Sequence, residues 1–392
     1  MKRVYADYSA TTALNEDVFE KMKPYFSLEY GNSSSIHGFG REANKAADKA
    51  RAQVAKAIGA LPEEIYFTSG GTESDNWAVI GTAFANQKKG KHIITSSIEH
   101  HAVLHTFQYL EKQGFIVTYL PVDQYGLIDV KQLEKAITPE TILISIMFAN
   151  NEIGTIEPVA EIGKVASAHK IPFHTDAVQA IGNVEINVKE MNIDMLSLSA
   201  HKFNGPKGVG ALYIKKSQRI DNFMYGGAQE RNKRPGTLNT PAIVGLGYAI
   251  ELATANIPKH NEEILKLSLR LREGIEKIPD VRLNGHPTLR LCGNTNYSFR
   301  YIEGESLLLS LDLKGIAASS GSACTSGALD PSHVLLAIGL PHEIAHGSLR
   351  LTIGKGTTIE DIDYILEALP PIVDRLRFMS PLYNDKECKR YV

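Results

Sequence analysis

The chain has 392 residues, of which 43% are hydrophobic and 22% are charged, the composition of an ordinary water-soluble globular protein of two or three domains. Its net charge of −2 offers no excess positive charge for nucleic acid or for an anionic membrane. The three cysteines, Cys292, Cys324 and Cys388, are odd in number and far apart, which predicts neither a disulfide framework nor a metal site. Few cysteines, no apolar signal region at the N-terminus and no apolar run long enough for a bilayer lead us to expect a cytoplasmic protein.

Short apolar runs alternate with helical patterns over the first 215 residues. The expected strands cover residues 64–70, 92–97, 115–120, 142–149, 171–177, 193–200 and 210–216, and the helices between them include 73–86, 100–113, 130–137 and 159–169. Buried parallel strands give near-continuous apolar runs, so this alternation predicts an α/β sheet covered by helices on both faces. Ligands of such sheets bind at the carboxyl ends of the strands.

The pattern changes after about residue 240. A long helical stretch (241–278) leads to shorter strand candidates and to a closing helix near 359–377. We therefore expect a large α/β domain over residues 14–250 and a smaller α+β domain. The smaller domain is formed by residues 1–13 together with 251–392 and carries Cys324.

Polar side chains follow four of the predicted strands. Gly71 and Thr72 come after the first of them, with Thr72 at the expected N-cap of a helix, and such a turn can bind an anion. Two glycines before a capped helix are more often only a turn. Asn151, Asp176 and Lys202 follow three other strands, and each alone can be read as a capping or loop residue. Four strands that end in different polar chemistry favour a functional site.

Lys202 and Asp176 together indicate a cofactor. Lys202 follows an apolar strand, and partial burial would lower its pKa and provide the neutral amine that Schiff-base chemistry requires. A lysine that extends from a strand end into solvent is the alternative for this residue taken alone. A strand-end carboxylate such as Asp176 is what a protonated pyridine nitrogen requires. The pair indicates pyridoxal 5′-phosphate, with the phosphate at the Thr72 turn beside Ser199.

Eight stretches in order carry a resemblance that runs almost end to end. They are DYSATT (7–12), TSGGTESDN (68–76), SSIEHHAVL (96–104), FANNEIGTIEP (148–158), HTDAVQAIG (174–182), SLSAHKFNGPKGVGALY (197–213), RPGTLNT (234–240) and SSGSACTS (319–326). In these motifs the chain resembles the NifS/IscS-type cysteine desulfurases of the class V aminotransferase-like group. The resemblance implies the aspartate aminotransferase-like fold of PLP-dependent transferases, with a mixed, mostly parallel seven-stranded sheet. Ser33, where Pro is expected, and Lys355, where Arg is common, depart from the family pattern outside the catalytic set.

The resemblance also implies roles for single residues. Lys202 would carry the cofactor and move the Cα proton of the substrate, and Asp176 would keep the pyridine nitrogen protonated. Gln179 would hydrogen-bond the phenolic oxygen of the ring. His100 would stack over the ring and act as an acid or base toward the substrate thiol.

Further roles concern the phosphate and the substrate. Thr72, Ser199 and His201 would hold the phosphate together with Thr237 of a second subunit, which implies a homodimer. Asn151 would contact cofactor or substrate. Arg350 would take the substrate carboxylate by a two-pronged contact, although without the resemblance it reads as a surface arginine.

The nine residues 319–327 read SSGSACTSG and are all small, with Cys324 in the middle. In a desulfurase a nucleophilic cysteine must reach the substrate, take its sulfur and carry a persulfide to an acceptor. Small residues remove the packing that would hold such a loop, and about five extended residues on either side reach roughly 17 Å. This setting favours Cys324 as the sulfur carrier.

The sequence thus predicts a PLP-dependent cysteine desulfurase that converts L-cysteine to L-alanine and leaves a persulfide on Cys324. An iron–sulfur scaffold protein (IscU/NifU-like) is the expected acceptor, with tRNA thiolation through a relay as another use. One alternative is an aminotransferase or a selenocysteine lyase; transamination needs no thiol, so Cys324 argues against the first of these. The other is a protein that only binds a phosphorylated ligand, against which the Asp176–Lys202 pair argues.

Overall fold

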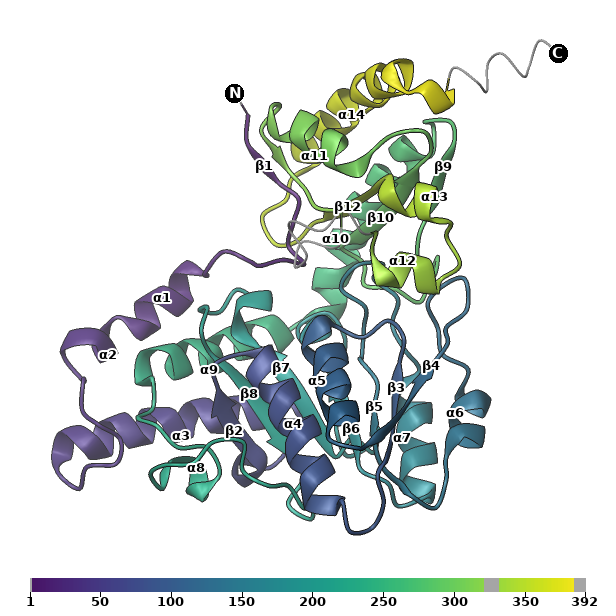
Figure 1. Ribbon diagram of the computed structural model, residues 1–392. Coiled ribbons are helices and arrows are strands. Elements are labelled where there is room, and N and C mark those ends of the chain that lie inside the picture. The colour runs from purple at the N-terminus through teal and green to yellow at the C-terminus, as the bar shows by residue number, and fades with distance from the viewer. Residues whose placement is uncertain (1, 321–330, 384–392) are drawn as a thin grey trace.

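The computed structural model describes residues 2–320 and 331–383, and a seven-stranded sheet forms the centre of its larger part (Figure 1). The strands are β2 (Ile65–Thr68), β3 (His92–Ser96), β4 (Ile116–Leu120), β5 (Thr141–Ser145), β6 (Phe173–Asp176), β7 (Met195–Ser199) and β8 (Gly210–Ile214). Their order is β2-β8-β7-β6-β5-β3-β4. Strand β8 is antiparallel to both neighbours, and all other pairs are parallel. The predicted mixed, mostly parallel sheet of seven strands is confirmed, although β5 and β6 are shorter than expected.

Helices cover both faces of this sheet. Helices α4 (Gly71–Asn86) and α5 (His101–Lys112) pack on one face, and α1 (Glu16–Met22), α3 (Gly38–Ile58), α6 (Val130–Ala136), α7 (Val159–Ala168) and α9 (Thr240–Thr254) pack on the other. Neighbouring residues of a strand serve opposite faces, as the pleat requires: Met195 packs with α4 and α5, whereas Leu196 packs on the other side. No helix of the described ranges combines the length and the apolar character needed to cross a bilayer.

A second hydrophobic core lies above the sheet in Figure 1. It is built from β9 (Val281–Leu283), β10 (Asn294–Phe299), β12 (Ser348–Thr352), α10 (Ile257–Ile275), α11 (Gly304–Asp312) and α14 (Ile359–Met379). Strand β1 (Val4–Tyr5) pairs in parallel with β11 (Ile316–Ala317), so the start of the chain packs with its C-terminal part. The exact domain boundaries, after residues 13 and 250, stay a prediction.

Shorter elements complete the fold. They are α2 (Pro24–Ser27), α8 (Gln229–Asn232), α12 (His333–Ala337), α13 (His342–His346) and two 3₁₀ turns, η1 (Pro62–Glu64) and η2 (Ala200–Lys202). Helices α12 and α13 contribute to a small apolar cluster that includes Ile98 and Met147, residues that follow β3 and β5.

The helix expected over residues 241–278 is wrong as a single element, because it consists of α9 and α10. Asn256 separates them with φ −157° and ψ 64°, and its side chain accepts a hydrogen bond from the Lys259 N–H (3.2 Å). Pro258 follows in the first turn of α10, where its missing N–H costs nothing. An N-cap and a proline therefore start a new helix inside a continuous helical pattern.

A buried ion pair joins three segments around β2. The Arg51 guanidinium donates to Glu230 Oε1 (2.7 Å) and Oε2 (2.8 Å), and the side chains are 9% and 1% exposed. The Phe67 N–H also donates to Glu230 Oε2 (2.8 Å), and Arg51 donates to the Ile65 carbonyl oxygen (2.7 Å). Glu230 thereby fixes α8 against α3 and β2.

Replacing Glu230 by Gln should remove the buried counter-ion of Arg51 and leave it only the exposed Asp48, whose Oδ1 lies 3.9 Å from Arg51 Nε. We expect a loss of about 3–5 kcal/mol in the free energy of unfolding, measured by urea denaturation. Glu262→Gln is the matched control, because Glu262 forms an exposed pair with Lys266 (2.7 Å) and should unfold like wild type. Equal behaviour of the two variants would contradict this account of the pair.

Candidate active site

The carboxyl ends of β6 and β7 bring predicted site residues to one edge of the sheet. Asp176 is the last residue of β6 and Ser199 the last of β7, and the two strands are parallel neighbours. The 3₁₀ turn η2 follows β7 directly and ends at Lys202. The strand order alone thus places a lysine and a carboxylate at adjoining strand ends, as predicted.

Backbone carbonyl groups of the N-terminal segment accept hydrogen bonds from the Lys202 amine. Its Nζ donates to the carbonyl oxygens of Ser9 and Ala10, the latter at 3.0 Å. Gln179 Nε2 donates to the same Ser9 oxygen at 3.0 Å. Lys202 and Gln179 border a hollow of about 350 Å³ that extends between the two cores. The predicted partners of the ring therefore share one contact, the Ser9 carbonyl group.

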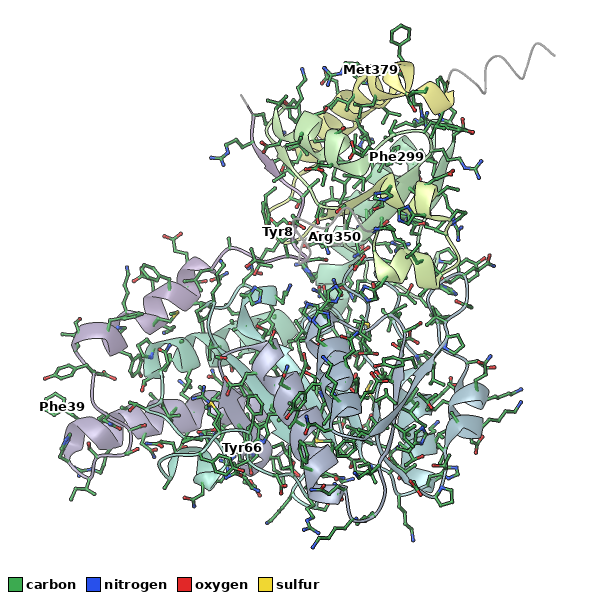
Figure 2. The ribbon with its side chains drawn as sticks, in the orientation of Figure 1. Tyr8, Phe39, Tyr66, Phe299, Arg350 and Met379 are labelled. Atoms are coloured by element: carbon green, nitrogen blue, oxygen red, sulfur yellow. The ribbon has the colours of Figure 1, made fainter. Side chains whose placement is uncertain are left out.

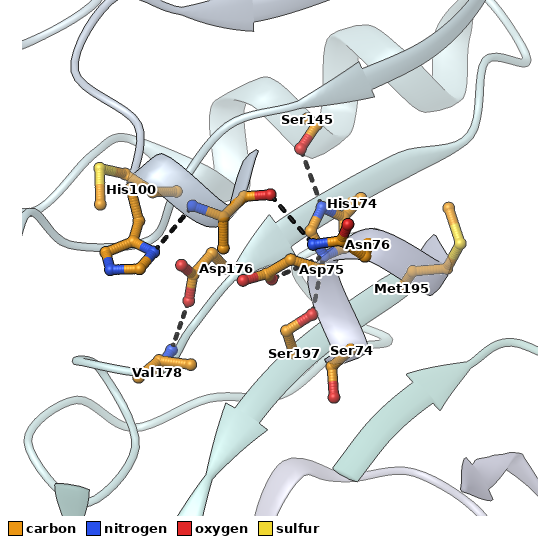
Figure 3. Close-up of polar contacts among 12 residues, drawn as sticks. Ser74, Asp75, Asn76, His100, Ser145, His174, Asp176, Val178, Met195 and Ser197 are labelled. Carbon is orange, nitrogen blue, oxygen red and sulfur yellow. Dashed lines mark hydrogen bonds and ion pairs between the residues drawn. The ribbon is translucent and has the colours of Figure 1, made fainter. Parts of the chain in front are cut away.

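Two buried carboxylates, Asp176 and Asp75 of α4, lie close together beneath this edge (Figure 3). Burial raises the pKa of Asp176 to about 6, while the Val178 N–H (2.9 Å) and the charge of Lys202 act in the opposite direction. Burial and the charge of Asp176 raise the pKa of Asp75 well above its ordinary value. Both carboxyls therefore hold a proton more tightly than an exposed aspartate does.

His174 lies beside Asp75, one of the two carboxylates. Its Nε2 lies 3.6 Å from Asp75 Oδ1 and 3.0 Å from Ser197 Oγ, and its Nδ1 lies 2.8 Å from Ser145 Oγ (Figure 3). Burial lowers the pKa of His174 to about 3, so the ring is neutral. The neutral His174 ring therefore does not neutralise the negative charge of Asp176.

His100 caps helix α5 and remains neutral at physiological pH. Its Nδ1 accepts a hydrogen bond from the Ala102 N–H (3.1 Å), which fixes the ring at the helix start. Burial, with a smaller effect of the Lys202 charge, lowers the pKa of His100 to about 4. With Thr72 and Asn76, His100 borders a second hollow of about 350 Å³ between α4 and α5. Because Nδ1 accepts the Ala102 N–H, the neutral ring carries its proton on Nε2 and can donate a hydrogen bond from there.

The glycine turn before α4 differs from the prediction in one respect. Gly70, not Thr72, is the N-cap, and Thr72 is the second residue of the helix. Gly70 has φ 153°, which L side chains rarely adopt, and a Cβ on Gly71 would lie 2.7 Å from Val178 Cγ2. The turn therefore requires glycine for conformation and for close packing. The first turn of α4 still offers N–H groups that have no acceptor within the helix, as an anion site needs.

His201 lies in the same turn as Lys202. Its Nδ1 is 3.0 Å from Thr11 Oγ1, and burial, together with the Lys202 charge, lowers its pKa to about 4. His201 thus lies at the predicted edge, and in this structure its ring contacts the N-terminal segment.

Arg350 on β12 is buried, so its reading as a surface arginine is wrong. The residue is 2% exposed and lies near Tyr8 at the junction of the two cores (Figure 2). Its Nη1 donates to the Asn151 carbonyl oxygen (3.0 Å), and its Nη2 donates to Asp7 Oδ1 (2.7 Å). Its Nε is buried and has no hydrogen-bond partner among residues 2–320 and 331–383. Within this part of the chain the Nε–H donor is therefore unused.

Not every predicted residue comes to this place. Thr237 is exposed in the chain between α8 and α9 and borders neither hollow. Cys324 and Cys388 lie outside the described residues. Cys292 is half-buried, and burial raises the pKa of its thiol to about 11.

Sequence reasoning missed Asp75 and Asp7. Asp75 stands on a helix with Ala78, Val79 and Thr82 three, four and seven residues later, all buried. An acidic residue on the apolar face of a helix was a usable signal. Asp7 offered none, because its partner Arg350 is 343 residues away.

Comparisons with known proteins point to one family. Residues 4–365 match the family model of the class-V aminotransferases. The chain is 62% identical over 381 residues to the cysteine desulfurase IscS of Methanosarcina thermophila, covering 97% of this chain and 94% of that protein. A solved NifS-like protein matches with a TM-score of 0.91 at 39% identity, covering 96% of this chain and all of that one. SspA, solved in complex with cysteine, matches with a TM-score of 0.81 at 40% identity, with 91% and 100% coverage.

The carboxyl of Glu99, next to His100, should make folding depend on pH. Glu99 is fully buried, and its Oε1 accepts from Ser96 Oγ (2.6 Å) and the Met147 N–H (2.9 Å). Its Oε2 has no hydrogen-bond partner among the described residues. Burial raises its pKa from 4.5 to about 8. The folded state therefore holds this proton more tightly, and the stability it contributes is full below pH 4.5 and lost as pH rises through 8.

Glu99→Gln should flatten the decline in unfolding free energy between about pH 5 and pH 8, by up to about 1.4 kcal/mol per pH unit. Urea unfolding at several pH values measures this slope. Glu262→Gln, in the exposed pair with Lys266, should keep the wild-type slope. A Glu99→Gln slope equal to wild type would refute the assignment.

Proposed function

The chain belongs to the cysteine desulfurases of the class-V aminotransferase family, and we propose that it moves the sulfur of L-cysteine onto Cys324 and releases L-alanine. In this reaction the Cβ–S bond of the substrate breaks, an S–S bond forms at the Cys324 sulfur, and Cβ receives a proton. A thiol and L-cysteine thus become a persulfide and L-alanine without an external oxidant or reductant. The observation that carries the proposal is the buried Asp176 beside Lys202 at adjoining strand ends.

The enzyme uses pyridoxal 5′-phosphate, and the residues at the strand ends fit it. A buried carboxylate needs a positive partner, and a protonated pyridine nitrogen provides one for Asp176. Lys202 would hold the aldehyde carbon and Gln179 the phenolic oxygen. The phosphate would be held by Gly71, Thr72, Ser199 and His201. When bound, the cofactor supplies an electron sink for negative charge at the substrate Cα.

The side chains divide the proton transfers between them. Lys202 takes the Cα proton of the substrate and delivers a proton later. His100 acts as an acid or base toward the substrate thiol; in its neutral form the Nδ1 accepts the Ala102 N–H, so it meets the thiol with its Nε2–H. Arg350 and Asn151 hold the substrate carboxylate, which orients Cα toward Lys202.

The case for Cys324 rests on its neighbours in the chain and on the other cysteines. Ser319 pairs with Arg350 through the backbone (Ser319 N–H to Arg350 O, 3.2 Å), and four extended residues beyond Ser320 reach at most roughly 14 Å. Cys324 is therefore tethered within reach of the substrate-binding arginine. Cys292 is a poor candidate, because a thiol with a pKa of about 11 is seldom a thiolate.

We further propose that the chain forms a homodimer in which Thr237 reaches the phosphate site of the partner. Thr237 is exposed, as a residue that serves another subunit must be before assembly. Large apolar side chains are exposed nearby in sequence and around the start of α3, including Tyr225 (87%) and Ile36 (92%). Burying such side chains is a common reason for association.

The sulfur acceptor proposed for the persulfide is an iron–sulfur scaffold protein, with a tRNA-thiolation relay as the second possibility. A cytoplasmic location fits an enzyme that needs Cys324 as a thiol, because the cytoplasm keeps thiols reduced. The protein that receives labelled sulfur from the persulfide form would decide between the two acceptors.

Cys324→Ser should abolish alanine formation while the protein still binds pyridoxal 5′-phosphate, because a hydroxyl is a far poorer nucleophile toward sulfur than a thiolate. Lys202→Ala should lose turnover by on the order of 10²–10⁴-fold together with the visible absorbance of the lysine-bound cofactor. Cys292→Ser is the matched control and should keep the wild-type rate.

Mass spectrometry after incubation with L-cysteine, without reductant, should place one added sulfur on the peptide that holds Cys324. Sulfur found on Cys292 or Cys388, or alanine formed by Cys324→Ser at the wild-type rate, would overturn the proposal.

Ile36→Glu should weaken the homodimer, because Ile36 is 92% exposed in the single chain and an interface would bury the new charge. Sedimentation velocity measures the dissociation, and activity should fall with it if Thr237 serves the partner subunit. Leu313→Glu is the control, since Leu313 is 73% exposed beside the other core. A wild-type protein that is monomeric and fully active would exclude the shared site.

A further inference from the structure

A short N-terminal segment connects Arg350 to Lys202. This strap, residues 7–10, begins with Asp7, whose Oδ1 lies 2.7 Å from Arg350 Nη2, and ends with the Ser9 and Ala10 carbonyl oxygens that accept from Lys202 Nζ. The Tyr8 and Ser9 N–H groups donate to the Thr352 carbonyl (3.2 Å) and Oγ1 (2.9 Å). Figure 2 shows Tyr8 and Arg350 near each other between the two cores.

Asp7 holds half of a fork that suits a carboxylate. In a guanidinium group, the Nε–H and the adjacent Nη2–H point in parallel and can bind both oxygens of one carboxylate. Here Asp7 contacts Nη2, while the buried Nε has no hydrogen-bond partner in the part of the chain that the structure describes. The Asp7 side chain is 18% exposed, whereas that of Arg350 is 2% exposed. Asp7 thus uses only one of the two parallel N–H donors of Arg350, and it is the more exposed partner of the pair.

The ion pair of Asp7 with Arg350 is stable only while no other carboxylate binds the guanidinium. A buried arginine needs a counter-ion, and Asp7 supplies it in the absence of substrate. A substrate carboxylate brings its own negative charge, and two carboxylates at one fork repel each other. One of them must therefore leave Arg350 when the other binds.

We propose that the α-carboxylate of the substrate displaces Asp7 from Arg350, and that this displacement shifts the strap, with its Ser9 and Ala10 carbonyl groups, beside Lys202. Asp7 is then a positioning residue that couples occupation of the carboxylate site to the position of the strap. The inference rests on the proposed function for Arg350 and Lys202.

The strap can transmit such a movement because it is short and closed on itself. The Ala10 N–H donates to the Asp7 carbonyl oxygen (3.0 Å), which makes residues 7–10 a single tight turn. Ser9 follows Asp7 by two residues, and its carbonyl is shared by Lys202 and Gln179. A shift of the Asp7 backbone therefore moves the Ser9 and Ala10 carbonyl groups with it.

Propionate tests the first half of the proposal, because it has a carboxylate and no amine with which to react at the cofactor. Its affinity for the holoenzyme is measured by the shift of the thermal unfolding midpoint, at ionic strength held constant with NaCl. Asp7→Asn should bind propionate about threefold more tightly or better than wild type, since no ion pair has to be broken. Asp361→Asn, which loses the pair with Lys2 (2.9 Å), should bind it like wild type.

Equal or weaker binding of propionate by Asp7→Asn overturns the inference. Arg350→Lys separates this failure from a failure of the proposed function, because it removes the fork and keeps the charge. If Arg350→Lys binds propionate as well as wild type, Arg350 is not the carboxylate site and both proposals fall. If binding needs Arg350 but does not improve in Asp7→Asn, the displacement of Asp7 alone is wrong.

Hydrogen–deuterium exchange tests the second half on the wild-type holoenzyme, independently of how any variant folds. Saturating propionate should speed exchange at the amides of Tyr8 and Ser9, whose N–H groups donate to Thr352, whereas the Ala10 amide, bonded to Asp7 inside the turn, should stay protected. A purely structural Asp7 would leave these amides as protected as before. Unchanged or slower exchange overturns the coupling.

Discussion

The buried carboxylate at the end of β6 is the constraint on which the site depends. Asp176 is 6% exposed, and an isolated charge in such a place is costly unless a positive group lies beside it. The parallel pairing of β6 with β7 brings Lys202 to it, and the crossover of the chain through α4 brings Asp75. The charge of Asp176 raises the pKa of Asp75, and His174 stays unprotonated, so Lys202 is the cation that lowers the pKa of Asp176.

The need of a buried charge for a partner of opposite sign also bears on how the start of the chain packs with its C-terminal part. Arg350 is as deeply buried as Asp176 and needs a negative partner of its own. Pairing of β1 with β11 and the Tyr8 contact with Thr352 hold Asp7 against it. The first ten residues thus belong to the site, although they precede the first strand of the sheet by more than fifty positions.

The sheet could be predicted because its strands are buried on both faces and therefore have continuous apolar sequences, as in residues 193–200. Asp176 and Lys202 could be predicted for a related reason, since each follows such a run directly. The break at Asn256 was missed because the apolar pattern continues through it and only the capping geometry stops the helix. Helix α3 was not named, although Ala43, Ala46, Ala47 and Ala50 form its buried stripe; alanine contributes little to an apolar signal.

Contacts between distant parts of the chain could not be predicted from apolar runs. The pairing of Asp7 with Arg350 depends on how two cores are placed against each other, and neither residue lies in a periodic pattern that reports its partner. Their burial is a property of the assembled fold. A family resemblance supplied the role of Arg350, but only the structure supplies Asp7, its counter-ion.

The chain that carries Cys324 is anchored at both ends to the residues that would hold the substrate. On one side Ser319 pairs with Arg350, and on the other Ser332 donates to the buried Glu152, the neighbour of Asn151. Arg350 in turn donates to the Asn151 carbonyl oxygen, so the two anchors are joined through one hydrogen bond. A site built from Asp176 and Lys202 can stabilise negative charge at Cα for many reactions. Under the proposed function, sulfur transfer is selected among them by the Cys324 thiol, because the chain on both sides of it is held by hydrogen bonds at Arg350 and next to Asn151.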